Sequence, residues 1–496
     1  PHRRRAVAFA GLRVSAVAWE ELATRRPGHT ALTAAARHSH CKRLAAEGDL
    51  ARACTALTAP PALAPSPDTL VSLQAKHPQA PDLSALGSPR PGAVPDFEIE
   101  AVAQAVQGFK RGSAPGPSGL RADHLREALL SAHADEVATD LTGPRVAGLL
   151  LASASEVGVG VPSGCDVAVH ATRAWLHHNS GHADKILVKL DFRNAFNSVD
   201  RTALLRAVRA DSPECACWAD WCYGCSSRLL FGDSVIQSTC GVQQGDPLRP
   251  LFFALVLQPA LAAAEGPLDL RYAFLDDVVL AGSSVPVCRA LDRLTAEAAR
   301  VGLVLEPTKS EVVVPNSGIC PLASCGVAAS LSCWAPLLAG PPTATMELPD
   351  AQTALLLLRY CASHVKLVHA ARVTPPPLHE PALLEFDERV RSCLEHIGAL
   401  TLTQQAWRQA CLKVRLGGLG LRSASRHAPA AYIAYVSACA AACSQLDPNF
   451  RLDLSQPVAT YNAAVAAGDR VPPAPQHVRQ QQLSAALDAA ELAAIQ

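Results

Sequence analysis

Three acidic residues in two separate segments have the types and settings that metal-dependent chemistry requires. Asp191 ends the apolar, strand-like run 186–191, and Asp276 with Asp277 lies between two further strand-like runs in 271-RYAFLDDVVLAGS-283. A hairpin with acids at its turn places carboxylates at the edge of a sheet. If that hairpin pairs with the strand before Asp191, the carboxylates converge, and their repulsion raises a pKa unless cations neutralise them.

Such a set of carboxylates is suited to a pair of divalent ions. Two ions about 3.5–4 Å apart stabilise both the attacking and the leaving oxygen in phosphoryl transfer. Oxygen ligands favour Mg²⁺, with Mn²⁺ as a second choice, over zinc. We therefore expect two or three of Asp191, Asp276 and Asp277 to converge on a metal site that handles phosphates. Because an isolated Asp-Asp pair is commonly ordinary turn chemistry, this interpretation depends on the neighbouring segments.

Two neighbouring segments strengthen the interpretation. The first, 241-GVQQGDPLRPLFFAL-255, is a polar glycine turn that leads into a helix, and the amides of Gln243 and Gln244 can bond a base edge or the backbone. The second, 302-GLVLEPTKSEVV-313, places Lys309 in a loop between short strands. Both segments therefore supply polar groups close in sequence to the acidic elements.

Taken in order, these segments resemble the reverse transcriptases of non-LTR retrotransposons. LDFRNAFNSVDR, GVQQGDPL, FLDD and GLVLEPTK are similar to four successive palm motifs of that family. SAPGPSGL and GVGVPSGCDVAVHATRAW are similar to motifs on its fingers side, and QACLKVRLGGLGLRSA, near 409–424, to a segment downstream of the polymerase. In the last of these, the glycines resemble a dinucleotide loop only superficially, because the strand-to-helix pattern with a downstream acid is missing.

The resemblance implies an α+β fold built as a right-hand polymerase. It predicts a palm, made of an antiparallel sheet with packed helices, and partial fingers within residues 96–325. A basic and proline-rich region, with a linker at 58–95, precedes it over 1–95, and a mainly helical, thumb-like region with a disordered tail follows over 326–496. The apolar patterns give the elements: a strand at 186–191, helices at 201–209, 248–264 and 286–301, a strand pair within 270–281, short strands at 303–305 and 311–314, and helices through 382–445.

The resemblance also assigns roles to individual residues. Asp191 and Asp276 would bind the two metal ions, with Asp277 as a supporting acid, and Lys309 would protonate the departing pyrophosphate unless it is a plain surface lysine. Phe196 would lie beneath the sugar and collide with a 2′ hydroxyl, which favours deoxynucleotides. A buried core phenylalanine is the alternative for that residue.

The nucleotide pocket would be lined by Gln244 and Gly245, where glycine allows close approach of the backbone. Residues 130–159 are shorter than the corresponding family segment and lack its basic triphosphate grip, so the chain has the features of a degenerate copy. Lys110 and Arg121 would compensate in part. Arg249 replaces the small residue that usually follows Asp-Pro-Leu in the family.

The predicted function is RNA-directed DNA polymerisation, with an RNA template, a DNA primer or target and dNTPs as partners. Two alternatives remain: a catalytically silent nucleic-acid-binding remnant, and an RNA-dependent RNA polymerase. With 44 basic and 44 acidic residues, any contact with nucleic acid must be local. The longest apolar run, 251–264, is too short to cross a membrane.

The setting of the protein follows from its cysteines and its first residues. Seventeen scattered cysteines and no secretory signal predict an intracellular, nuclear or nucleocytoplasmic protein. The missing initiating Met predicts that the chain begins inside a longer product.

Overall fold

The computed structural model describes the chain in several stretches: residues 33–58, 66–80, 157–159, 161, 163–231, 234–246, 248–315, 341–476 and 478–496. The chain divides into two compact units. One comprises residues 1–64 and 91–148, and the other comprises residues 65–90 and 149–496. The predicted helix at 98–109 and nearly all of the shortened segment 130–159 lie outside the described residues.

The described part of the first unit is a pair of helices. Helix α2 (Ala34–Ala46) begins after Thr33, whose hydroxyl accepts the backbone N–H of Ala36 at 3.2 Å and so satisfies one of the free amides of the first turn. Helix α3 (Leu50–Thr58) packs against α2. Part of the predicted basic N-terminal region therefore has regular structure.

A four-stranded antiparallel sheet forms the centre of the second unit. Its strand order is β4 (Leu270–Phe274), β5 (Asp277–Ser283), β1 (Lys185–Leu190) and β6 (Glu311–Val313). Every pairing is antiparallel, and Leu190 lies opposite Val278. The strands predicted at 186–191, within 270–281 and at 311–314 are confirmed, while the predicted strand 303–305 is reduced to a single bridge between Leu305 and Phe192.

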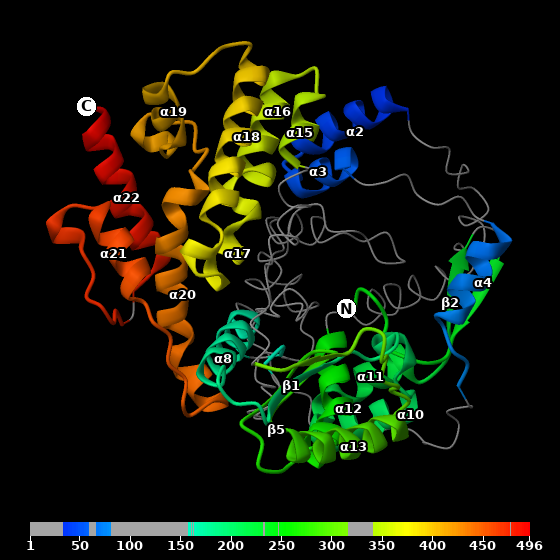
Figure 1. The fold of residues 1–496 in the computed structure, drawn as a ribbon. Helices are drawn as coiled ribbons and strands as arrows, with labels where there is room; N and C mark the ends of the chain where they lie inside the picture. The colour runs from blue at the N-terminus through cyan, green and yellow to red at the C-terminus, as the bar shows by residue number, and fades with distance from the viewer. Residues whose placement is uncertain are drawn as a thin grey trace, which may run out of the picture. The chain divides into compact units, whose positions relative to one another are not determined.

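Helices cover both faces of this sheet (Figure 1). Because successive side chains of a strand alternate between faces, Leu187 and Val279 point to one side, where they join a core with Trp175 of α8 (Gly164–His178). Helices α12 (Arg249–Ala263) and α13 (Ser284–Arg300) lie on the other side and pack against each other. The predicted helices 248–264 and 286–301 are thereby confirmed.

Smaller elements complete the surroundings of the sheet. They are α9 (Ala195–Ser198), α10 (Arg201–Asp211), α11 (Ala216–Tyr223) and a hairpin of β2 (Ser227–Phe231) and β3 (Ser234–Ser238). Helix α4 (Pro67–Ala75) lies within the predicted linker. Just after it, the Ala80 backbone N–H donates to Thr239 Oγ1 at 2.9 Å, so the stretch 66–80 is attached beside β3.

Residues 341–496 are mainly helical, as predicted, and two helices run through the core of this region. Helix α18 (Glu380–Gly398) and helix α20 (Ala424–Leu446) pack against each other. Around them lie α15 (Pro341–Met346), α16 (Ala351–Leu357), α17 (Val368–Val373), α19 (Gln404–Cys411), α21 (Ser455–Ala463) and α22 (Gln480–Ile495).

The prediction of a disordered tail was wrong. Helix α22 buries Leu483 and Leu487 in a core shared with Ile433 of α20. Its acids also pair with bases that lie far away in the sequence, which local composition does not reveal. No helix among the described residues is both long and apolar enough to cross a membrane.

Candidate active site at the end of the sheet

The pairing of the strands brings two of the predicted acids together. Asp191 follows the last residue of β1, and Leu190 pairs with Val278 next to the β4–β5 turn. That turn consists of Leu275 and Asp276, because the flanking Phe274 and Asp277 pair with each other. The pKa of Asp276 is raised, mainly by burial and further by the negative charges of Asp277 and Asp191. Asp191 and Asp276 are therefore close enough to repel each other.

Asp277 has a different partner. Its Oδ1 lies 3.4 Å from Nζ of Lys189, a β1 residue that the sequence analysis did not single out. In the described stretches of the chain, no three His, Cys, Asp or Glu side chains are grouped so as to hold a metal ion. The chemistry of the remaining pair still fits, because Asp191 and Asp276 present only carboxylate oxygens, which suit Mg²⁺ or Mn²⁺.

The loop after α13 is fastened to Asp191. The Asp191 backbone N–H donates to Ser310 Oγ at 3.1 Å, and its carbonyl accepts the Glu306 N–H at 2.8 Å. Lys309 Nζ lies 3.9 Å from Asp191 Oδ1 while the side chain stays 65% exposed. The predicted proton donor is thus beside the acid and also open to solvent, which leaves both interpretations of Lys309 standing.

Phe196 is half-buried at the same end of the sheet. Its ring lies 4.5 Å from that of Phe253 on α12, so part of the side chain belongs to the core. The guanidinium carbon of Arg249 lies 4.5 Å from the centroid of the Phe196 ring. The charge of Arg249 also lowers the pKa of Asp276, against the burial that raises it. Arg249 therefore belongs to the site, although the sequence marked it only as a departure from the family pattern.

The loop before α12 holds the predicted pocket residues. Gln244 and Gly245 are both exposed, and Gly245 has φ +101° with no atom within 4 Å of a Cβ built on it. Gln243 instead donates through Nε2 to Ser227 Oγ at 2.5 Å and to the Cys222 carbonyl at 3.3 Å. Of the two adjacent glutamines, one therefore fixes the loop and the other is available.

Two residues that the sequence analysis missed support this loop. Arg201 is fully buried and donates to the carbonyls of Ser238 at 2.9 Å and Gly241 at 3.0 Å. The Tyr223 hydroxyl donates to Asp246 and accepts the Gln243 backbone N–H at 3.2 Å. A sequence read alone gives no reason to bury an arginine at a helix start, so these contacts emerge only in three dimensions.

The remaining predicted substrate residues, Lys110 and Arg121, lie outside the described residues. Whether they compensate for the shortened segment 130–159 stays a prediction.

Comparison with known proteins gives a family model, whose range includes the sheet and its acids, and a curated relative. Residues 150–341 match the family model for reverse transcriptase (RNA-dependent DNA polymerase). A stretch of 281 residues is 27% identical to the retrotransposable element SLACS 132 kDa protein of Trypanosoma brucei gambiense. The aligned part covers 48% of this chain and 22% of the relative, so the chain spans less than a quarter of the length of that protein.

Proposed function

We propose that this chain, whose residues 150–341 match the reverse transcriptase family model, is an RNA-directed DNA polymerase that extends a primer with deoxynucleotides. The single observation that carries this proposal is the meeting of Asp191 and Asp276 at one end of an antiparallel sheet. In this proposal the sheet is the palm of a right-hand polymerase. An RNA template, a primer and dNTPs are the expected partners.

Each residue of the site has a task in the proposal. Asp191 and Asp276 would hold two Mg²⁺ ions, which when bound activate the primer 3′ hydroxyl and neutralise charge on the triphosphate. Asp277 would be a supporting acid: it pairs with Lys189, and its negative charge raises the pKa of Asp276. Lys309, beside Asp191, would give a proton to the departing pyrophosphate.

Phe196 and the loop before α12 would select the nucleotide. The exposed part of the Phe196 ring would lie under the sugar, where a 2′ hydroxyl would collide with it. Gln244 and Gly245, exposed on the loop that Arg201 and Tyr223 support, would face the base and the sugar. This arrangement favours deoxynucleotides over ribonucleotides, and so favours a reverse transcriptase over an RNA-dependent RNA polymerase.

Primer extension tests the proposal. The full chain is given a DNA primer on an RNA template with Mg²⁺ and dNTPs, beside the Asp276→Asn variant and the control Asp292→Asn, which changes an exposed acid of α13. We expect extension by the wild type and the control, and a loss of at least about a hundredfold in the Asp276 variant, since electrostatic groups at a reacting centre contribute that much. Absence of extension by the wild type would overturn the proposal in favour of a silent remnant.

A further inference from the structure

A pocket in the C-terminal helical region is lined by four positively charged side chains. It has a volume of about 440 Å³, and Arg359, Arg372, Lys413 and Arg422 face it. They come from three separate segments: the turn 358–362 after α16, helix α17, and the loop between α19 and α20. No Asp or Glu is among the described residues that line this pocket.

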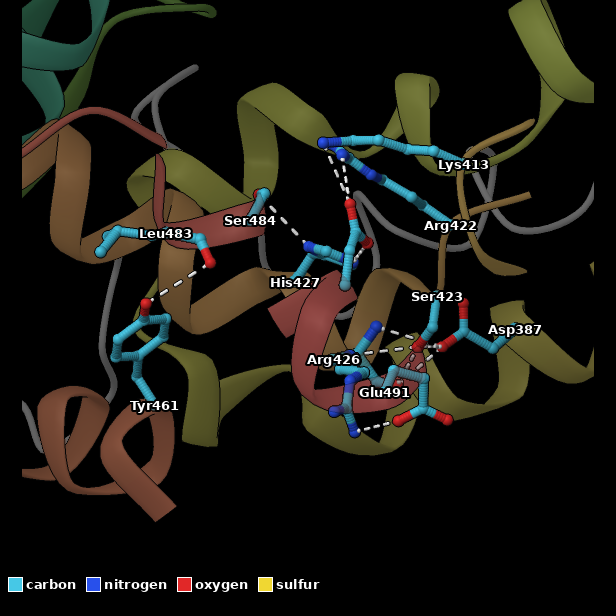
Figure 2. Close-up of polar contacts among 12 residues, drawn as sticks. Asp387, Lys413, Arg422, Ser423, Arg426, His427, Tyr461, Leu483, Ser484 and Glu491 are labelled. Atoms are coloured by element: carbon cyan, nitrogen blue, oxygen red, sulfur yellow. Dashed lines mark hydrogen bonds and ion pairs between the residues drawn. The ribbon is translucent and has the colours of Figure 1, made fainter. Parts of the chain in front are cut away.

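The charge of these four residues is only partly compensated. Lys413 and Arg422 share one carboxylate, that of Asp488, each at 3.1 Å, and Figure 2 shows their side chains lying alongside each other. Arg359 and Arg372 form no ion pair with any acid in the described part of the chain. The pocket therefore keeps an excess of positive charge, which an anionic ligand would balance.

Two buried polar atoms beside the pocket lack protein partners. His364 is 6% exposed and lines the pocket, and its Nδ1 has no hydrogen-bond partner among the described residues. Nε of Arg372 is likewise buried and unbonded in the described structure. Buried polar atoms are nearly always satisfied in folded proteins, so these two have room for a further hydrogen-bond partner, although the guanidinium carbon of Arg372 also lies 3.9 Å from the centroid of the Tyr435 ring. Burial, together with the charges of His427, Arg422 and Arg372, lowers the pKa of His364 to about 3, consistent with a strongly positive surrounding.

An exposed aromatic ring lies at the same place. Tyr360 is 46% exposed, and the guanidinium carbon of Arg359 lies 4.6 Å from the centroid of its ring. Proteins that hold single strands combine cations for the phosphates with aromatic rings on which bases stack. A free phosphate ion would need no such ring.

The glycine loop gives the pocket its shape. Gly420 has φ +76°, and a Cβ added there would lie 2.7 Å from Nε of Arg359. Gly418 is also confined, since a Cβ would lie 2.2 Å from the Leu412 carbonyl oxygen. The 417-GGLGL-421 segment thus allows the Arg359 side chain to lie flat against the loop that carries Lys413 and Arg422. This accounts for a motif that the proposed polymerase site does not use.

We propose that this pocket binds a phosphodiester of a single-stranded nucleic acid and that a flanking base stacks on Tyr360. The proposal rests on the proposed function only for the identity of the strand, which would be the RNA template outside the primed duplex. The pocket would then hold the unpaired template while the site at the sheet acts on the primer end.

A binding experiment tests the pocket. The full chain is titrated into a fluorescently labelled oligouridine RNA of about twelve nucleotides, and anisotropy is followed at several salt concentrations. The double variant Arg359→Gln/Arg372→Gln removes two charges without leaving an acid unpaired. The matched control Arg300→Gln/Arg389→Gln also removes two charges, each from a solvent-accessible pair within a single helix.

We expect Kd for RNA to rise at least about tenfold in the pocket variant, which is the ratio for one lost charge-assisted contact. The control should bind RNA as the wild type does. The slope of log K against log salt should fall by about 0.7, which corresponds to one phosphate contact on a single strand. Equal RNA affinity in the pocket variant and the control would overturn the proposal. So would binding of inorganic phosphate at the pocket with no difference in RNA affinity.

Crosslinking shows where RNA lies on the chain, independently of its affinity. RNA that contains 4-thiouridine should crosslink to the peptide that carries Tyr360, and Tyr360→Ala, a change at an exposed ring, should abolish that adduct. Adducts confined to residues near the sheet would overturn the pocket. Since the Asp276→Asn protein should bind and crosslink normally, the two proposals fail separately. If the wild type extends primers and the pocket variant binds RNA normally, only the pocket proposal is refuted. If the wild type does not extend primers but the pocket variant loses RNA binding, only the polymerase proposal is refuted.

Discussion

The guanidinium carbon of Arg249 lies 4.5 Å from the centroid of the Phe196 ring, and its charge lowers the pKa of the nearby Asp276. Arg249, the first residue of α12, thus places a positive charge near both Phe196, the proposed sugar-sensing ring, and Asp276, a proposed metal ligand. The family that the sequence resembles has a small residue in this position. The sequence predicts that the segment 130–159 lacks the basic grip of that family, and we propose that this arginine supplies positive charge to the triphosphate instead.

Replacement of Arg249 should therefore weaken the binding of the nucleotide. For Arg249→Ser we expect KM for dNTP to rise about tenfold or more, since a charge-assisted contact contributes about 1.5–3 kcal/mol. The KM of Arg249→Lys should lie between those of the wild type and Arg249→Ser, because lysine keeps the charge but lacks the planar group that stacks on Phe196. Steady-state primer extension over a range of dNTP concentrations measures this. A lower KM in Arg249→Ser would show instead that the guanidinium blocks the pocket.

Phe196 should control the choice of sugar. In Phe196→Val we expect the preference for dNTP over the matching rNTP, taken as the ratio of kcat/KM values, to fall by at least about tenfold, because the steric conflict with the 2′ hydroxyl is relieved. The control is Phe253→Leu, which disturbs the ring that packs on Phe196 but leaves Phe196 in place. A similar fall in the control would assign the effect to loosened packing rather than to the sugar contact.

Asp276 should destabilise the protein when no metal is bound. Its pKa in the folded protein is raised above the ordinary 3.8. Between pH 3.8 and that raised pKa, the folded state therefore binds more protons than the unfolded state. Stability therefore falls as the pH rises through that window, and the penalty persists at neutral pH. We expect Asp276→Asn to have a higher Tm than the wild type at pH 7.5 in EDTA, as measured by calorimetry.

Added Mg²⁺ should reverse this order. It should raise the Tm of the wild type and leave that of Asp276→Asn nearly unchanged, because an ion that binds only the folded state stabilises it. Asp292→Asn, at an exposed site, should follow the wild type in both conditions. A wild-type Tm that ignores Mg²⁺ would count against a metal site at these acids.

The sequence predicted the sheet and the meeting of Asp191 with Asp276 because these depend on short-range patterns. Alternation fixes the strands, and the two-residue turn places Asp276 at the sheet end. The ion pair of Asp277 with Lys189 was not predictable, since it depends on the register in which Lys189 pairs across the sheet with Val279. The buried Arg201 was missed for the same reason, because its partners lie 24 to 40 residues away.

The error at the C-terminus has a related cause. Residues 480–495 are rich in alanine and glutamine and follow a proline-rich stretch, which favours disorder when they are read alone. Their helix is held by Asp488 and Glu491, whose partners Arg422, Arg426 and Arg408 precede them by more than sixty residues. Charge pairs of this range have no periodicity in the sequence.

Asp488 should make the docking of α22 depend on pH. The carboxylate is 3% exposed and accepts from Lys413 and Arg422, and from His427 Nε2 at 3.3 Å. Burial alone would raise the pKa of Asp488, but the hydrogen bonds from His427 and Lys413 and the charge of Arg422 hold it well below its ordinary value. The stability that it contributes is thus present above about pH 4 and is lost as the pH falls further.

In Asp488→Asn the half-buried Lys413 and Arg422 lose their counter-charge, so we expect the free energy of unfolding of the C-terminal region at pH 7 to fall by about 3 kcal/mol. Urea titrations followed by circular dichroism, with hydrogen exchange of the α22 amides, measure this. The variant should also lack the part of the wild-type decline below about pH 4 that Asp488 causes. The control Glu385→Gln, in an exposed pair with Arg389, should change stability by less than about 1 kcal/mol. If Asp488→Asn unfolds like the wild type at pH 7, apolar packing of Leu483 and Leu487 alone holds the helix, and the ion pairs contribute nothing to its docking.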